Sequence, residues 1–334
     1  MKILVTGAAG FIGNHVALRL LEAGHEVVSI DNCNAYYDPS LKEARLARLQ
    51  DFSSFENKKN DLSIFSEVMN IFAHFQPHHV IHLAAQAGVR YSFSHPEAYV
   101  SSNLVGFFNV LEASRQTKVA HLVYASTSSV YGANKRLPFS EKDPVNHPLS
   151  FYAATKRSNE VMAHAYSHLY QIPMTGLRFF TVYGPWGRPD MALFKFTKAI
   201  LAEEPIVLYN HGRMQRDFTY IDDIVTGVLK VCAQSPQPST EEASDRSPVA
   251  PYRIYNIGNS APVELMDYVH AIETCLGKTA RCTMAPLQQG DVPATYADTT
   301  SLQADFAYIP RTPVTEGVAR FIEWYKNFYS NELC

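Results

Sequence analysis

A tyrosine and a lysine spaced four residues apart could act together on a proton. Tyr152 and Lys156 lie in the segment SFYAATKRSNE, whose composition is typical of a helix, and side chains at this spacing share one helix face. A phenol is a poor base at neutral pH because its usual pKa is about 10, but a nearby cation favours the phenolate and lowers that pKa. We therefore expect Tyr152 to be a general base that Lys156 activates.

A cluster of hydroxyl groups ends a predicted strand, in YASTSSVYG at residues 124–132. Ligands of open α/β sheets bind beyond the carboxyl ends of the strands. Thr127 could hydrogen-bond a substrate hydroxyl beside Tyr152, and Ser128 and Ser129 offer further small polar groups. The alternative is that these hydroxyls only satisfy the local backbone.

Three spaced glycines, Gly7, Gly10 and Gly13, follow another predicted strand and open a predicted helix. Such a turn lets the backbone approach a pyrophosphate, whose charge then faces the helix N-terminus. Asp31 ends the next predicted strand, where a carboxylate can accept both ribose hydroxyls of an adenosine. The same carboxylate would repel a 2′-phosphate, so the pattern favours NAD over NADP. An ordinary tight turn and a solvated acid are the alternatives.

Apolar runs that alternate with helical patterns must position these groups. The runs lie at residues 2–7, 26–31, 79–85, 121–127 and 174–180. Between the first two, Ile12, Val16 and Leu20 recur at helical spacing and Gly24 follows. This alternation predicts an α/β fold with a doubly wound parallel sheet of the Rossmann type.

In the second half of the chain the residue pattern changes, and this change predicts a smaller α/β domain. A helical pattern at 220–232 and an apolar run at 253–258 indicate a return to the first domain. We therefore expect an NAD-binding domain over residues 1–180, to which about 217–258 returns, and a discontinuous substrate domain over 181–334.

Composition narrows the possible partners. The 334 residues are 46% hydrophobic and 18% charged, which is typical of a compact globular protein. The 29 basic residues are outnumbered by 32 acidic ones, and no run of five basic residues occurs, so we expect no nucleic-acid partner. No apolar run approaches the roughly 20 residues of a membrane helix, so we expect no membrane partner. Residues 234–252, rich in Ser, Pro and acid, predict a surface loop.

The cysteines and histidines do not predict a metal site. The five cysteines contain no C-x-x-C pair, so neither a disulfide framework nor a zinc knuckle is expected, and a reducing, cytoplasmic location fits. Among His78, His79 and His82, strand alternation would place His79 on the face opposite the other two. We therefore expect no metal.

Several of these motifs together resemble the extended short-chain dehydrogenase/reductase family. They are TGAAGFIG at 6–13, Asp31, STSSVYG at 126–132, Tyr152 with Lys156, RFFTVYGP at 178–185 and RDFTYIDD at 216–223. Longer stretches are similar to the UDP-glucuronate 4-epimerases of this family, and they cover nearly the whole chain outside the loop at 234–252. They include residues 30–49, 83–92, 184–196 and 290–298.

The resemblance implies an NAD-dependent enzyme with assigned site positions, and a homodimer. The family binds adenosine and pyrophosphate at positions matching Gly7, Gly10, Phe11, Ile12, Gly13, Asp31 and Asn32. The adenine lies near Asp61 and Leu62, and the nicotinamide ribose near Leu83, Ala84, Ala85, Tyr152 and Lys156. Catalysis falls to Thr127, Tyr152 and Lys156. The sugar acid would face Ser128, Ser129, Thr181 and Arg188, and the uridine diphosphate would face Arg216 and Asp291. Arg90 could reach a phosphate or be solvated.

The implied reaction is the 4-epimerisation of UDP-glucuronate to UDP-galacturonate through a 4-keto sugar. Sugar 4,6-dehydratases of the family need an acid and a base where this chain has Ser128 and Ser129, and UDP-glucuronate decarboxylases carry a glutamate at the position of Ser129. UDP-galactose 4-epimerase is the main alternative, although such enzymes carry an arginine three residues before Asp291, where this chain has Gln288. A catalytically idle NAD-sensing or scaffold protein is the alternative from another class.

Overall fold

A seven-stranded sheet forms the larger layer of the protein. The computed structural model describes residues 1–239 and 247–329, so part of the predicted loop at 234–252 lies outside the described residues. The strands are β1 (Lys2–Thr6), β2 (Glu26–Ile30), β3 (Phe55–Lys58), β4 (His79–His82), β5 (His121–Thr127), β6 (Met174–Phe179) and β10 (Tyr252–Ile257). All of their pairings are parallel, in the order β10-β6-β5-β4-β1-β2-β3. The predicted doubly wound Rossmann-type sheet is confirmed.

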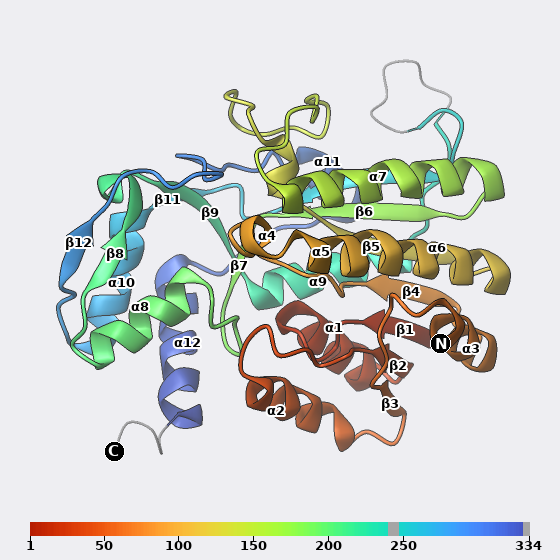
Figure 1. Ribbon diagram of the computed structural model, residues 1–334, viewed down its shortest axis with the longest axis horizontal. Helices are drawn as coiled ribbons and strands as arrows, with labels where there is room; N and C mark the ends of the chain where they lie inside the picture. The colour runs from red at the N-terminus through yellow and green to blue at the C-terminus, as the bar shows by residue number, and fades with distance from the viewer. Residues whose placement is uncertain (240–246, 330–334) are drawn as a thin grey trace.

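Helices cover both faces of this sheet (Figure 1). One face carries α1 (Phe11–Glu22), α2 (Pro39–Gln50) and α9 (Ile221–Ala233), and the other carries α3 (Phe65–Phe75), α6 (Gly106–Thr117) and α7 (Phe151–Tyr170). Successive residues of β1 alternate between the two cores, because Ile3 and Val5 pack with α1 whereas Leu4 packs with α3 and α6. A strand buried on both faces therefore reads as a continuous apolar run.

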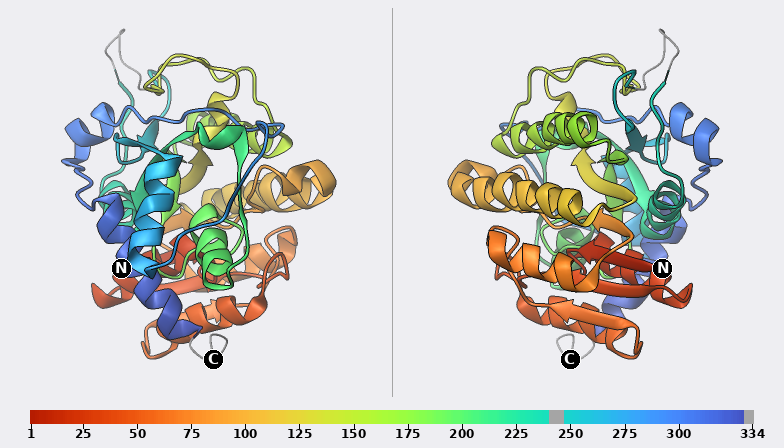
Figure 2. Two further views of the ribbon diagram at one scale, coloured as in Figure 1. Left: turned by 90° about the vertical axis from the view of Figure 1, so that its left-hand side faces the viewer. Right: turned by 90° about the vertical axis from the view of Figure 1, so that its right-hand side faces the viewer.

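A smaller region lies beyond one end of the large sheet (Figures 1 and 2). It contains a three-stranded sheet of β7 (Thr181–Tyr183), β9 (Gln215–Tyr220) and β11 (Pro262–Glu264), and a parallel pair of β8 (Ile206–Leu208) and β12 (Cys282–Met284). Its helices are α8 (Ala192–Leu201), α10 (Leu265–Leu276) and α12 (Val314–Phe328). Shorter helical segments are α4 (Tyr91–Ser94), α5 (Pro96–Tyr99), η1 (Val100–Val105), η2 (Ser128–Tyr131), η3 (Tyr209–Gly212) and α11 (Thr300–Phe306).

The crossover between the two halves of the sheet positions the site. Strands β2 and β3 lie on one side of β1, whereas β4, β5, β6 and β10 lie on the other. Loops that leave β1 and β4 therefore diverge at their carboxyl ends, which is where open α/β sheets bind ligands. Within the described ranges, no helix is both long enough and apolar enough to cross a bilayer.

Candidate active site

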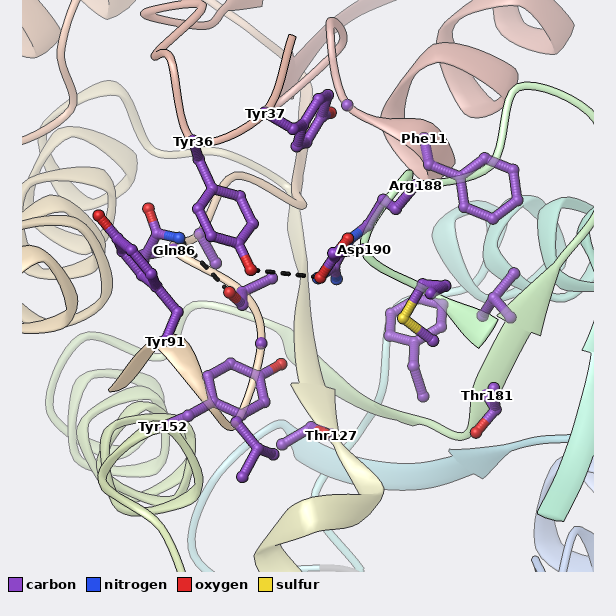
Figure 3. Close-up of a pocket in the computed structure, with 18 of the residues that line it drawn as sticks. Phe11, Tyr36, Tyr37, Gln86, Tyr91, Thr127, Tyr152, Thr181, Arg188 and Asp190 are labelled. Atoms are coloured by element: carbon purple, nitrogen blue, oxygen red, sulfur yellow. Dashed lines mark hydrogen bonds and ion pairs between the residues drawn. The ribbon is translucent and has the colours of Figure 1, made fainter. Parts of the chain in front are cut away.

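One cavity of about 840 Å³ lies between the carboxyl ends of the large sheet and the smaller region (Figure 3). Every residue that the sequence proposed for the cofactor, the substrate or catalysis lines it. These are Gly7, Gly10, Phe11, Ile12, Gly13, Asp31, Asn32, Asp61, Leu62, Leu83, Ala84, Ala85, Arg90, Thr127, Ser128, Ser129, Tyr152, Lys156, Thr181, Arg188, Arg216 and Asp291. Their individual roles remain predictions.

The glycine-rich turn between β1 and α1 leaves no room for side chains. Gly7 has a φ of +83°, and a Cβ there would lie 2.8 Å from the main-chain nitrogen of Ala84. A Cβ on Gly13 would lie 2.1 Å from the carbonyl oxygen of Gly7. The turn thus packs backbone against backbone and presents the N-terminus of α1 to the cavity, which fits a pyrophosphate.

Asp31 is anchored to this turn at the end of β2. Its Oδ2 accepts a hydrogen bond from the Ala9 backbone N–H at 3.0 Å, and its Oδ1 accepts one from the Cys33 N–H at 2.9 Å. Each carboxylate oxygen keeps a lone pair for a ribose hydroxyl.

The predicted adenine contacts lie beside Asp31. The Asn32 side chain donates a hydrogen bond to Asp61 Oδ2 at 2.8 Å. Burial alone would raise the pKa of Asp61, but hydrogen bonds from Ser63 and Asn32 outweigh it and hold that pKa below its usual range. Asp61 therefore presents a carboxylate at neutral pH.

Thr127 and Tyr152 meet at the centre of the cavity (Figure 3). Helix α7 begins after Ser150, whose Oγ accepts a hydrogen bond from the Ala153 N–H at 3.1 Å and so places Tyr152 in the first turn. Thr127 ends β5, where its Oγ1 accepts a hydrogen bond from the Ser129 N–H at 3.2 Å. The predicted catalytic side chains thus come from the ends of two elements that pack together.

The charges around Tyr152 differ from the expectation. Burial raises the pKa of the Tyr152 phenol, and the hydrogen bond with Thr127 and the Arg188 guanidinium oppose that rise. The Arg188 guanidinium thus opposes the rise, but the net change in the Tyr152 pKa is upward, whereas the spacing to Lys156 predicts a net lowering. Lys156 is itself buried, and burial lowers its pKa to about 8 while Glu160 opposes the change.

Arg188 is paired inside the cavity with an acid that the sequence did not single out. Arg188 Nε donates to Asp190 Oδ1 at 3.0 Å, and its NH2 group donates to Oδ2. The Tyr36 hydroxyl also donates to Asp190 Oδ2, at 3.2 Å (Figure 3). Burial and the Asp190 carboxylate raise the pKa of Tyr36 to about 12. The Arg-x-Asp spacing was a local signal for the ion pair, whereas nothing in the sequence pointed to Tyr36.

At the far end of the cavity, Asp291 lies between two arginines. Arg216 NH2 donates to Asp291 Oδ1 at 2.8 Å, and Arg90 NH2 lies 3.9 Å from Oδ2. The Arg90 guanidinium covers the ring of Tyr209, 4.8 Å from its centroid. Gln288 does not line the cavity, and its main-chain oxygen accepts from the Asp291 N–H. Arg90 and Arg216 thus supply positive charge at this end of the cavity, where galactose-type epimerases carry a further arginine at the position of Gln288.

The remaining substrate candidates lie between these two ends. Ser128 and Ser129 begin η2 directly after Thr127. Thr181 begins β7 and pairs with Phe218 of β9, at the junction of the large sheet and the smaller region. The cavity therefore offers several neutral hydroxyls as well as the Arg188 guanidinium.

Comparisons with known proteins agree with this geometry. The NAD dependent epimerase/dehydratase family matches residues 3–258. The chain is 53% identical to Protein CapI of Staphylococcus aureus, over 98% of this chain and 99% of that protein. It is 50% identical to a probable UDP-glucuronate 4-epimerase of Rhizobium meliloti, over 98% of each chain.

A solved structure shares the fold along its whole length. It is UDP-glucuronic acid 4-epimerase from Bacillus cereus in complex with UDP-glucuronic acid and NAD, which is 32% identical with a TM-score of 0.88. The similarity covers 98% of this chain and 100% of the solved one. Because both the sequence match and the fold match extend across the cavity, this chain belongs to the NAD dependent epimerase/dehydratase family.

Proposed function

We propose that this protein is an isomerase that converts UDP-glucuronate into UDP-galacturonate, with NAD as its cofactor. The observation that carries the proposal is the neutral Thr127–Ser129 turn, which lines the same cavity as Tyr152 and Arg188. Relatives from Rhizobium meliloti and Bacillus cereus carry the name of this activity.

The residues present fit the cofactor. The cradle from Gly7 to Gly13, where side chains would collide with backbone, would hold the pyrophosphate, and Asp31 would hold the adenosine ribose. Lys156 would hold the nicotinamide ribose from the floor of the cavity. When bound, NAD supplies a hydride acceptor and donor, and its positive ring adds a charge that favours the Tyr152 phenolate.

The chain's own groups handle the proton and the sugar. Tyr152 removes the proton from the 4-hydroxyl and returns it to O4 after the 4-keto sugar has turned over in the cavity. Thr127 hydrogen-bonds O4 and orients it toward Tyr152. Ser128, Ser129 and Thr181 supply neutral hydrogen bonds around the C5 carboxylate, and Arg188 supplies positive charge near it.

The neutral side chains of Ser128 and Ser129 distinguish epimerisation from the dehydration and decarboxylation reactions of the same family. Elimination of water across C5 and C6 needs an acid and a base beside the keto sugar, and the serine hydroxyls of Ser128 and Ser129 are poor acids and bases. The family's UDP-glucuronate decarboxylases carry a glutamate at the position of Ser129, and this chain does not. With NAD bound, epimerisation would need no side chain beyond those that line the cavity.

Product analysis tests the proposal directly. The purified protein, supplied with NAD and UDP-glucuronate, should form UDP-galacturonate that proton NMR resolves from the substrate. UDP-glucose is the matched substrate without the carboxylate, and a Tyr152→Phe variant controls for contaminating activity. Conversion of UDP-glucose with no conversion of UDP-glucuronate would assign the protein to the neutral-sugar epimerases instead.

We further propose a homodimer that works in the cytoplasm. Large apolar side chains on α6 and α7 are exposed, among them Phe108, Val161 and Leu169, and a second copy of this chain would cover them. Light scattering should give twice the chain mass, and Val161→Glu should shift the protein toward a monomer. Free cysteines fit a reducing compartment, and cell fractionation would test this.

We also propose a division of labour between the two regions of the chain. The seven-stranded sheet with its helices, to which α9 and β10 return, would form the NAD domain, and the smaller sheets would form the nucleotide-sugar domain. Limited proteolysis with and without NAD would test it, since bound cofactor should protect the first region more.

A further inference from the structure

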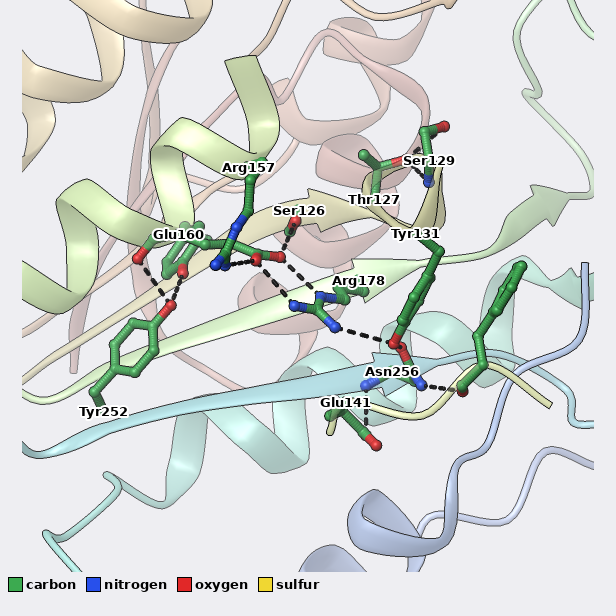
Figure 4. Close-up of polar contacts among 12 residues, drawn as sticks. Ser126, Thr127, Ser129, Tyr131, Glu141, Arg157, Glu160, Arg178, Tyr252 and Asn256 are labelled. Atoms are coloured by element: carbon green, nitrogen blue, oxygen red, sulfur yellow. Dashed lines mark hydrogen bonds and ion pairs between the residues drawn. The ribbon is translucent and has the colours of Figure 1, made fainter. Parts of the chain in front are cut away.

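A buried carboxylate lies one helical turn beyond Lys156. Glu160 of α7 is 1% exposed, and its two oxygens accept four hydrogen bonds (Figure 4). Oε1 accepts from Ser126 Oγ at 2.7 Å and from Arg178 Nε at 2.9 Å. Oε2 accepts from Arg178 NH2 at 3.0 Å and from Arg157 NH1 at 2.8 Å. The carboxylate is therefore fully satisfied, and its orientation is fixed from three elements.

The Glu160–Arg178 ion pair holds the catalytic turn from both ends. Ser126, which Glu160 binds, directly precedes Thr127 at the end of β5. Arg178 of β6 donates through NH1 to the Tyr131 hydroxyl at 3.0 Å and lies over the Tyr131 ring, 4.9 Å from its centroid. Tyr131 is the last residue of η2. The turn at residues 127–129 is thus fastened before its first residue and after its last.

The same pair connects this turn to the helix that carries Tyr152 and Lys156. Glu160 belongs to α7, so its hydrogen bond to Ser126 joins α7 to the end of β5. On the opposite side, the Tyr252 hydroxyl of β10 donates to the Glu160 carbonyl oxygen at 3.0 Å. A shift of α7 relative to β5 would have to break buried hydrogen bonds, each of which is costly to leave unmade.

Glu160 also places negative charge next to a buried ammonium. Lys156 and Glu160 share one face of α7. Burial lowers the pKa of Lys156, and the Glu160 carboxylate opposes this change. No described side chain accepts a hydrogen bond from Lys156 Nζ, so no such bond stabilises the ammonium. The titratable groups around Glu160 are Arg157, Arg178, Tyr124 and Tyr252, and Tyr131 contacts Arg178. His82 lies near Lys156, and Tyr152 precedes Lys156 by one turn of α7. Burial raises the pKa of the four tyrosines and lowers that of His82 to about 3. Among these groups, Lys156 is therefore the one whose pKa lies at weakly alkaline pH.

We propose that the Glu160–Arg178 ion pair is a positioning pair of the catalytic site, which fixes the Thr127–Ser129 turn against Tyr152 and holds the Glu160 carboxylate on the helix face that carries Lys156. Neither residue lines the cavity, so both act through the groups that do. The inference rests on the proposed epimerisation for the reaction that the site performs.

A double substitution tests the charge. Removing one partner alone would leave a buried unpaired charge, whereas neutral groups of similar size are often tolerated in place of a buried pair. In Glu160→Gln with Arg178→Met, Lys156 should lose its proton at lower pH, because its counter-charge is gone. The alkaline limb of the kcat/KM profile of the NAD-loaded enzyme should move to lower pH by roughly one unit. Because the turn is released as well, kcat should fall about tenfold or more.

A matched control makes the same chemical changes on another pair. Glu112 and Arg115 of α6 form an ion pair away from the cavity, so Glu112→Gln with Arg115→Met should leave the limb in place. Ser126→Ala removes only the tie to the turn, and it should lower kcat without moving the limb. Glu160→Asp keeps the charge and should likewise keep the limb.

The outcomes separate this inference from the proposed function. A folded Glu160/Arg178 double variant whose limb and kcat match the wild type overturns the positioning pair. If that variant does not fold, Ser126→Ala and Glu160→Asp decide, and wild-type kcat in both overturns the proposal. A wild-type protein that does not epimerise UDP-glucuronate in the same assay contradicts the proposed function instead.

Discussion

Arg188 donates two hydrogen bonds to Asp190 from Nε and NH2, which form one edge of its guanidinium, so this edge is already occupied by a carboxylate of the chain. A sugar acid would therefore displace Asp190, bind the remaining edge of the guanidinium, or bind the neutral hydroxyls that line the same cavity. In each case Arg188 contributes positive charge to the cavity in which the C5 carboxylate is expected.

Arg188→Ala should therefore lower the affinity for UDP-glucuronate more than the affinity for UDP-glucose. Hydrogen bonds that involve charged groups contribute about 1.5–3 kcal/mol, so the ratio of the two kcat/KM values should change at least about tenfold. Asp190→Asn, which leaves the guanidinium in place and frees it, should instead favour UDP-glucuronate. Equal losses on both sugars in Arg188→Ala would show that Arg188 does not read the carboxylate.

Tyr152→Phe should retain the fold and NAD binding while the general base is lost. Turnover should fall at least about 100-fold, which is the contribution typical of such groups. Single-turnover measurements on UDP-glucuronate would check this, with NAD content measured by absorbance. Near-normal turnover in the Phe variant is incompatible with Tyr152 as the base.

Activity should decrease as the pH rises through about 8, where Lys156 loses its proton. Burial lowers the pKa of this amine, so the ammonium form is present below that pH and is lost above it. Lys156→Arg keeps a positive charge to much higher pH and should move this limb upward, whatever its effect on the maximal rate. The kcat/KM profile from pH 6 to pH 10 measures both, and identical limbs would contradict the assignment.

Asp31→Ala should weaken NAD binding and reduce the preference for NAD over NADP. The carboxylate is lost from the predicted ribose site, and so is the hydrogen bond from Ala9 that anchors it to the glycine turn. Calorimetry with both cofactors gives the ratio of the NADP and NAD dissociation constants for the wild type and for the variant. A wild-type protein that prefers NADP would show that the ribose assignment is wrong.

Gly13→Ala should destabilise the glycine turn by at least about 2 kcal/mol, because the new methyl group would collide with the Gly7 carbonyl. Gly24→Ala is the matched control. Gly24 has a φ of +77° but open space around it, so the cost there should be about 1 kcal/mol of backbone strain. Denaturant unfolding measures both, and a Gly13→Ala variant as stable as the wild type would contradict the collision with the Gly7 carbonyl.

Local patterns were sufficient for the fold class and for the first site candidates, whereas the resemblance added most of the other residues that line the cavity. The apolar runs predicted six of the strands of the large sheet because strands buried on both faces read as nearly continuous hydrophobic runs, as at residues 79–85. Strand β3 was missed, because this edge strand reads FENK and has no apolar run to mark it. The glycine turn and Asp31 could be recognised because both lie within one βαβ unit.

Only the tertiary structure decided which charges meet. Tyr36 and Asp190 are 154 residues apart in the chain, and Ser126, Glu160 and Arg178 come from three different elements, so no local spacing encodes their contacts. The pKa of Tyr152 shows the same limit. The spacing to Lys156 predicts a lowered value, but burial raises it, because the free energy of charging a phenol depends on how much solvent the folded chain excludes.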